Sequence, residues 1–160
     1  MSEVELSNID YKVTEAESCL HVKNRKLLEL WLAHRDEDGT ASREKLSPAL
    51  LLPLLGGISV TEPVDDGKDF RFRLVGARNE ERLGIKATGR LMSDCYGPRM
   101  ASELITLHNR VLDARKPAVL RGRFVGIGIE HALFEALFLP VRSAAGDLQV
   151  LAGMYDMSEN

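Results

Sequence analysis

His131 and Glu135 are the two residues of this sequence whose types and spacing could support acid–base catalysis. A strand is expected over residues 129–141, and side chains four positions apart in a strand lie on the same face of the sheet. The imidazole and the carboxylate would then be close enough to exchange a proton. A salt bridge is the alternative, because ion pairs shift pKa values without catalysing a reaction. A small enzyme with a cone-like α+β pocket that uses His131 and Glu135 as acid and base is therefore one hypothesis.

The other reactive side chains lack the spacing of a catalytic or metal site. Cys95 has no histidine near it in the sequence, and we expect Cys19 and Cys95 to be free thiols in a reducing compartment. Gly126 and Gly128 are followed by a strand rather than by the helix that a dinucleotide-binding loop requires. The four histidines do not have the spacing of zinc ligands; they are His21, His34, His108 and His131.

Four arginines alternate with other residues in two expected strands, as Arg71 with Arg73 and as Arg121 with Arg123. The alternation places both members of each pair on one face. If the two strands were neighbours, the arginines would form a positive patch that could hold a carboxylate or an acidic segment of a partner. The alternative is a solvated face with local ion pairs to Glu135 or to the N-terminal acids.

The composition is typical of one globular domain. The chain has 160 residues, of which 44% are hydrophobic and 28% are charged, with a net charge of −3. This charge argues against a nucleic-acid partner, because phosphate binding needs a basic face. The longest apolar run, residues 49–58, contains Pro53 and is shorter than the roughly 20 residues that span a bilayer. The N-terminus lacks a secretory signal, so we expect a cytoplasmic protein without membrane contact.

The expected elements follow one another without a repeat or a linker. Residues 1–13 are polar and are expected to be loosely attached. One or two helices, with a capping box at Thr14 and Glu17, are expected over residues 14–34. The strongest helical pattern covers residues 97–115, and shorter helices are expected after a proline and between two glycines. Strands are expected over residues 57–64, 68–75, 118–125, 129–141 and 148–156, which indicates an α+β fold with a mixed or antiparallel sheet.

One segment resembles the signature of a known family. RNEERLGIKATGR, residues 78–90, looks like a shortened PAS signature, in which a helix with an asparagine ends in leucine-glycine and a second glycine follows. The upstream pair Leu30-Trp31 and the stretches LLPLLGGISV and FRFRLVG are similar to a bacterial subfamily of small PAS proteins. The resemblance covers residues 27–154. The other residues that carry it are Arg35, Arg43, Pro48, Asn79, Leu83, Gly84, Thr88, Gly89 and Arg90.

The resemblance implies a PAS fold, with a five-stranded antiparallel sheet, helices on one face, an N-terminal helix and a pocket beneath the long helix. We place the PAS domain at residues 27–157 and an N-terminal tail or helical extension at residues 1–26. The implied function is a non-enzymatic sensory or interaction module of bacterial signal transduction that binds a small molecule, an unidentified signalling protein or both. The residues expected to line the pocket are Phe72, Leu74, Leu104, His108, Phe124 and Leu137.

Two cofactors of PAS proteins, flavin and haem, can be compared with the residues of this sequence. The asparagine-cysteine-arginine-phenylalanine motif of flavin photosensors is absent, so covalent flavin photochemistry is not expected. Haem-binding PAS proteins resemble one another in placing an axial histidine on the long helix, where His108 lies. Haem therefore remains a hypothesis.

The strand at residues 129–141 is apolar on both faces, so a solvated outer face is not expected. We expect the N-terminal helix, through Leu27, Leu30 and Trp31, to cover the outer face of its own sheet or of a partner's, which would produce a homodimer. A ligand-free dimerisation adaptor with a filled core is the remaining hypothesis.

Overall fold

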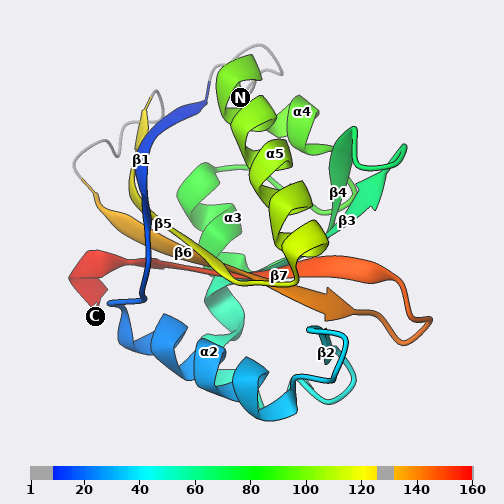
Figure 1. Ribbon diagram of the computed structural model, residues 1–160. Coiled ribbons are helices and arrows are strands. Elements are labelled where there is room, and N and C mark those ends of the chain that lie inside the picture. Colours follow the sequence, from blue (N-terminus) through cyan, green and yellow to red (C-terminus); the bar gives the residue numbers. More distant parts are fainter. Residues whose placement is uncertain (1–8, 126–131, 160) are drawn as a thin grey trace.

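One sheet forms the centre of the computed structural model, which describes residues 9–125 and 132–159 (Figure 1). Across the sheet the strands follow the order β1 (Asp10–Ala16), β5 (Ala118–Val125), β6 (Phe134–Arg142), β7 (Leu148–Asp156), β3 (Ile58–Val64) and β4 (Asp69–Val75). All of these neighbours are antiparallel. A seventh strand in the described residues, β2 (Ala41–Ser42), pairs with β6 in parallel.

Helices cover both faces of this sheet. The described helices are α2 (Val22–His34), α3 (Ala77–Leu83), α4 (Met92–Cys95) and α5 (Pro98–Ala114), and two 3-10 turns, η1 (Leu52–Gly57) and η2 (Met157–Glu159), accompany them. Figure 1 shows α3 and α5 on one side of β6 and β7 and α2 on the other. We call these the inner and the outer face. Each has its own apolar core, to which Phe70 and Leu104 contribute on the inner face and Trp31 and Leu139 on the outer face.

The long helix α5 agrees with the prediction for residues 97–115 to within one residue at each end. Pro98 occupies the first helical position, where its missing N–H costs nothing. Arg115 follows the last turn in the left-handed conformation, with a φ of 55°. Between these ends, Leu104 and Val111 belong to a buried stripe that faces the sheet.

The start of the N-terminal helix differs from the prediction. Residues through Ala16 form a strand, so the expected capping box at Thr14 and Glu17 is wrong and α2 begins only at Val22. The N-cap of α2 is His21, whose ring nitrogen Nδ1 accepts a hydrogen bond of 3.1 Å from the backbone N–H of Lys23. A histidine ring therefore does the work that the capping box was expected to do.

The sheet is wider than the five strands expected, because β1 and β2 were not predicted. In β1, Tyr11 is buried and Lys12 is exposed, so the alternation of a strand was present in the sequence but was obscured by polar residues. The strand β2 has two residues, too few for a pattern. The domain boundary after residue 26 stays a prediction, although β1 pairs along its whole length with β5. Within the described residues, no helix combines the length and the apolar character that a membrane span requires.

Candidate functional site

A cavity of about 70 Å³ lies between the inner face of the sheet and the helices α3, α4 and α5. Most of its wall is apolar, including Phe72, Met92, Met100, Leu104, Phe124, Phe134, Phe138 and Met154. The polar side chains on its wall are Tyr11, Ser59, Thr61, Asn79, Tyr96 and His108.

The periodicities of the helix α5 and the strand β6 place the lining residues on the faces that surround the cavity. On α5, Met100, Leu104 and His108 are four residues apart, so they lie above one another on the face toward the sheet. In β6, Ala136 and Phe138 line the cavity, whereas the residues between and beside them face outward.

His108 is a buried, neutral histidine. Its ring lies between α5 and the sheet, with ring centroids 5.1 Å from those of both Phe70 and Phe138. The ring nitrogen Nδ1 is 2.7 Å from the carbonyl oxygen of Leu104, and because a carbonyl only accepts, Nδ1 carries the proton. Burial lowers the pKa of His108 to about 4. Nε2 is therefore the nitrogen that can accept a hydrogen bond.

The surroundings of His108 do not fit haem. The cavity of about 70 Å³ is smaller than the roughly 300–1,000 Å³ of sites for drug-sized ligands, and a porphyrin is a large ligand. Phe70 and Phe138 also pack against the imidazole, so the ring is surrounded by side chains of the core. The haem hypothesis is therefore not supported by the residues around His108.

Two polar side chains on the wall have different roles. The hydroxyl of Thr61 is buried and has no hydrogen-bond partner within the described residues. Both polar atoms of the Asn79 side chain, in contrast, form hydrogen bonds: its amide nitrogen donates to Gly57 O at 3.0 Å, and its oxygen accepts from Arg82 at 2.7 Å. Arg82 continues to Asp156 at 2.9 Å, so Asn79 ties α3 to the end of β7. Because buried polar groups are normally paired, the Thr61 hydroxyl is a group available to a ligand.

Comparison with known families now agrees with the geometry. A family model described as a PAS domain matches residues 19–156, which is most of the chain. The chain belongs to the PAS domain family. A search of curated proteins gave no match. PAS domains act in general as sensory or interaction modules, and the α+β class predicted from the sequence is confirmed.

Four of the six residues that the sequence predicted for the pocket of this PAS domain line the cavity, namely Phe72, Leu104, His108 and Phe124. Leu137 lies instead on the outer face of β6, fully buried in the outer core. The strand is apolar on both faces, so its sequence did not indicate which set of residues turns inward. Phe134, Ala136 and Phe138 are the set that does.

Leu74 also lies outside the cavity, and it is 43% exposed. Between β3 and β4 the register shifts, since Val60 pairs with Leu74 while Thr61 pairs with Phe72. Arg73 is thus an extra residue in β4, and the alternation of faces breaks after Phe72. Because of the same register shift, Thr61 was not predicted as a pocket residue. Its place opposite a predicted pocket residue becomes visible only once the register is known.

Glu135 is a structural carboxylate on the outer face, where it is fully buried. Its two oxygens accept from Leu20 N at 2.7 Å, His21 N at 3.0 Å, Asn24 Nδ2 at 3.2 Å and Arg121 at 2.8 Å. Burial opposes ionisation, but these donors outweigh it and lower the pKa of Glu135. The carboxylate holds the N-terminus of α2 on the sheet. The partner expected for acid–base chemistry, His131, lies outside the described residues.

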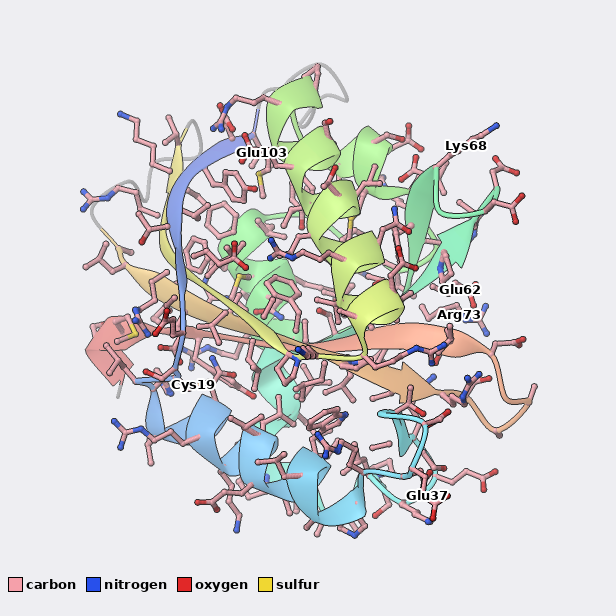
Figure 2. The ribbon with its side chains drawn as sticks, in the orientation of Figure 1. Cys19, Glu37, Glu62, Lys68, Arg73 and Glu103 are labelled. Carbon is pink, nitrogen blue, oxygen red and sulfur yellow. The ribbon has the colours of Figure 1, made fainter. Side chains whose placement is uncertain are left out.

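The predicted patch of four arginines does not form, because β4 and β5 lie in different parts of the sheet. Arg73 approaches Glu62 at 3.7 Å on the β3–β4 side of the molecule, and both are labelled in Figure 2. On the β5 side, Arg121 is paired with Glu135, whereas Arg123 is exposed.

The residues predicted as an interface lie on the side of α2 that packs against its own sheet. Leu27 and Trp31 are fully buried against the outer face of their own sheet, and Leu30 is half-buried. The indole N–H of Trp31 donates to Pro140 O at 2.9 Å. In this chain α2 therefore covers its own sheet, and a homodimer stays a prediction.

In the described part of the chain, the thiols and acids are not gathered into a metal-binding group. Cys19 and Cys95 are free and buried, and burial raises the pKa of each thiol to about 11. Over residues 9–125 and 132–159, no three histidine, cysteine, aspartate or glutamate side chains are grouped as metal ligands.

Proposed function

We propose that this PAS domain is a non-enzymatic sensory module that binds a small, mostly apolar molecule in its inner cavity and transmits binding to a signalling protein. The observation that carries the proposal is the buried hydroxyl of Thr61, which lies on a mostly apolar wall and has no hydrogen-bond partner within the described residues. A packed core without a binding role would normally pair or exclude this group.

The size of the cavity bounds the ligand. About 70 Å³ exceeds the roughly 10–15 Å³ that one water needs and is about half the 150 Å³ of an apolar cavity known to take up benzene. The wall contains Met92, Met100 and Met154, whose flexible side chains can rearrange around a guest. We therefore expect a ligand no larger than a single aromatic ring.

The polar groups on the cavity wall limit the chemical class of the ligand. The Thr61 hydroxyl can donate or accept, and His108 can accept through Nε2. A ligand with one hydroxyl or N–H group would satisfy the threonine, whereas a charged ligand would find no counter-charge among the described residues of this wall. Neutral, weakly polar compounds are the expected class.

Phenol and benzene make a matched pair of probes, because they differ by one hydroxyl. We expect both to perturb the amide signals of cavity residues in ¹⁵N-labelled full-length protein, and phenol to bind about fivefold more tightly, since a neutral hydrogen bond contributes about 1 kcal/mol. Thr61→Val should abolish this preference. Thr88→Val, at an exposed position, is the control and should retain it.

Filling the cavity provides the opposing test. Ala136 lines it and is almost fully buried, so Ala136→Leu should occupy the space and prevent both probes from binding. Undiminished binding to a folded Ala136→Leu variant would refute the cavity as the site. The adaptor hypothesis is favoured if neither probe perturbs the cavity and native mass spectrometry of gently purified protein finds no retained molecule.

The enzyme hypothesis has less support. Glu135 already accepts four hydrogen bonds and lies on the face opposite the cavity, so its carboxylate is not placed to act on a cavity ligand.

A cytoplasmic location and a homodimer remain parts of the proposal. The free thiols of Cys19 and Cys95 support a reducing compartment. The exposed side chain of Leu32 on α2 offers apolar surface for a second copy. Light scattering of the full chain, which has a mass of 17.8 kDa, tests the dimer directly.

A further inference from the structure

A second hollow, of about 530 Å³, lies on the outer face beside β1 and β5. The helix α2 covers the part of this face formed by β6, β7 and β3, and the hollow occupies the part next to its N-terminal end. We call it the β1–β5 groove. Its main lining residues are Lys12, Thr14, Leu20, Arg123, Leu133 and Met157.

Two positive charges in the groove have no counter-charge among the described residues. Lys12 and Arg123 are both exposed, and they lie directly opposite each other in the β1–β5 register. In the part of the chain that the structure describes, neither forms an ion pair, whereas the neighbouring Arg121 is 2.8 Å from Glu135. Like charges directly opposite in a sheet destabilise it. An anionic group between them would remove that repulsion.

Apolar side chains lie beside these charges. Leu20 and Leu133 are 44% and 46% exposed. Their backbones are held in place, because Leu20 N donates to Glu135 at 2.7 Å and Leu133 O accepts from Met157 N at 2.8 Å. The two leucines are thus presented to solvent on a fixed frame. Exposed apolar side chains gathered at a hollow are typical of an interaction site.

We propose that the β1–β5 groove docks an acidic amphipathic helix of a partner protein. Two carboxylates of the helix would lie against Lys12 and Arg123, and its apolar stripe would cover Leu20 and Leu133. Acids at helix positions i and i+4 have Cβ atoms about 5–6 Å apart, which matches the roughly 4.5–5.5 Å between opposite residues of antiparallel strands.

The openness of the groove favours a protein segment over a small molecule. Nearly half of each leucine side chain is in contact with solvent, so only an occupant that reaches from β1 across to β6 can cover both leucines and meet both charges. The charge sign selects an acidic partner. This inference concerns the outer face and does not depend on ligand binding in the inner cavity.

The probe is a synthetic amphipathic helical peptide with glutamates at positions i and i+4 and leucines on the adjoining stripe. Titrated into ¹⁵N-labelled full chain, it should cause saturable shifts at the amides of Lys12, Leu20, Arg123 and Leu133. The double variant Lys12→Glu, Arg123→Glu should weaken binding about tenfold or more, because reversed charges at an interface repel the ligand. Lys68→Glu is the control, since Lys68 is exposed at the turn beside the opposite edge strand, β4 (Figure 2).

Several results would overturn the proposal. These are shifts confined to another face, equal binding of a peptide with lysines in place of the glutamates, and equal weakening by Lys68→Glu. If the charge reversal lowers the melting temperature, the pair Lys12→Gln, Arg123→Gln removes the charges without creating new ones, and unchanged binding to it also overturns the idea.

Light scattering tests for another occupant: if Leu133→Ser converts a dimer to a monomer, a second copy occupies the groove instead. A shift of the same amides by decanoate as strong as by the peptide would assign the groove to an anionic amphiphile.

Discussion

Replacing Glu135 by glutamine tests whether one buried carboxylate fastens α2 to the sheet. One oxygen accepts from His21 N and Asn24, and the other accepts from Leu20 N and Arg121. Glutamine has the same shape, but an NH₂ group replaces one oxygen. Because that group only donates, two of the four donors lose their acceptor.

The expected loss follows from these contacts. A hydrogen bond to a charged group contributes about 1.5–3 kcal/mol, and removing one partner of a buried ion pair costs about 3–5 kcal/mol. The two effects overlap, since Arg121 is both an ion-pair partner and one of the donors. We therefore expect Glu135→Gln to lower the free energy of unfolding by about 3–5 kcal/mol at neutral pH.

The loss should also depend on pH. Hydrogen bonding lowers the pKa of Glu135 below its ordinary value of 4.5, despite the opposing effect of burial. A carboxyl whose pKa is lowered by folding stabilises the protein above its unfolded pKa, and this contribution disappears as the pH falls through the folded pKa. The difference between wild type and Glu135→Gln is thus complete at pH 7 and shrinks below about pH 4.5.

Urea unfolding of both proteins at neutral and acidic pH measures this difference. Other titrating groups, including His108, are present in both proteins and cancel. Glu17→Gln, at an exposed position, serves as the control and should change stability by less than about 0.5 kcal/mol. A loss below about 1 kcal/mol at pH 7 would contradict the contribution calculated for a paired buried carboxylate, and so would a loss that is equally large in acid.

Three further outcomes are expected. Trp31→Ala should lower the free energy of unfolding by about 3–5 kcal/mol, because the ring is fully buried beneath α2; a loss typical of a surface site would contradict this. Gly122→Ala should accelerate amide exchange in β1, since a Cβ there would collide with Lys12 O, and unchanged protection would be inconsistent with the close β1–β5 approach. His108 should contribute a loss of roughly 3 kcal/mol of stability as the pH falls from 6.5 to 4, because its pKa is about 4 in the fold and 6.5 when unfolded. His108→Leu should therefore show a shallower slope of urea midpoints with pH, and a slope identical to that of wild type would show that His108 is not the group responsible.

Most of the fold was accessible to sequence reasoning because its signals are local. The strands β3 and β4 follow from the turn residues between them and from the alternation in β4, the strands β5 to β7 from short apolar runs, and the helix α5 from its apolar stripe. The strand β1 carried the same alternation, in Tyr11 and Val13 against Lys12 and Thr14, but its charged residues suggested a loose tail. An edge strand tolerates such polarity because half of its surface stays in water.

The candidate site was less accessible because its contacts are not local. Glu135 meets Leu20 and Asn24, which are 115 and 111 positions away, so its role as an anchor for α2 has no signature in its own neighbourhood. Leu74 was assigned to the pocket because regular alternation was assumed, and the register shift between β3 and β4 reversed its direction.

The amino-acid sequence alone was sufficient for the PAS family, the α+β class, the long helix and the aromatic character of the inner core, since each depends on residue type and short-range spacing. Tertiary structure decided which face of β6 meets the cavity and, among the described residues, which hydroxyl is left without a partner and which charges are left without an ion pair. The physical reason is that a strand with apolar residues on both faces can pack in either orientation. Here the orientation of β6 is set by α5, which packs on one face of the sheet, and by α2, which packs on the other.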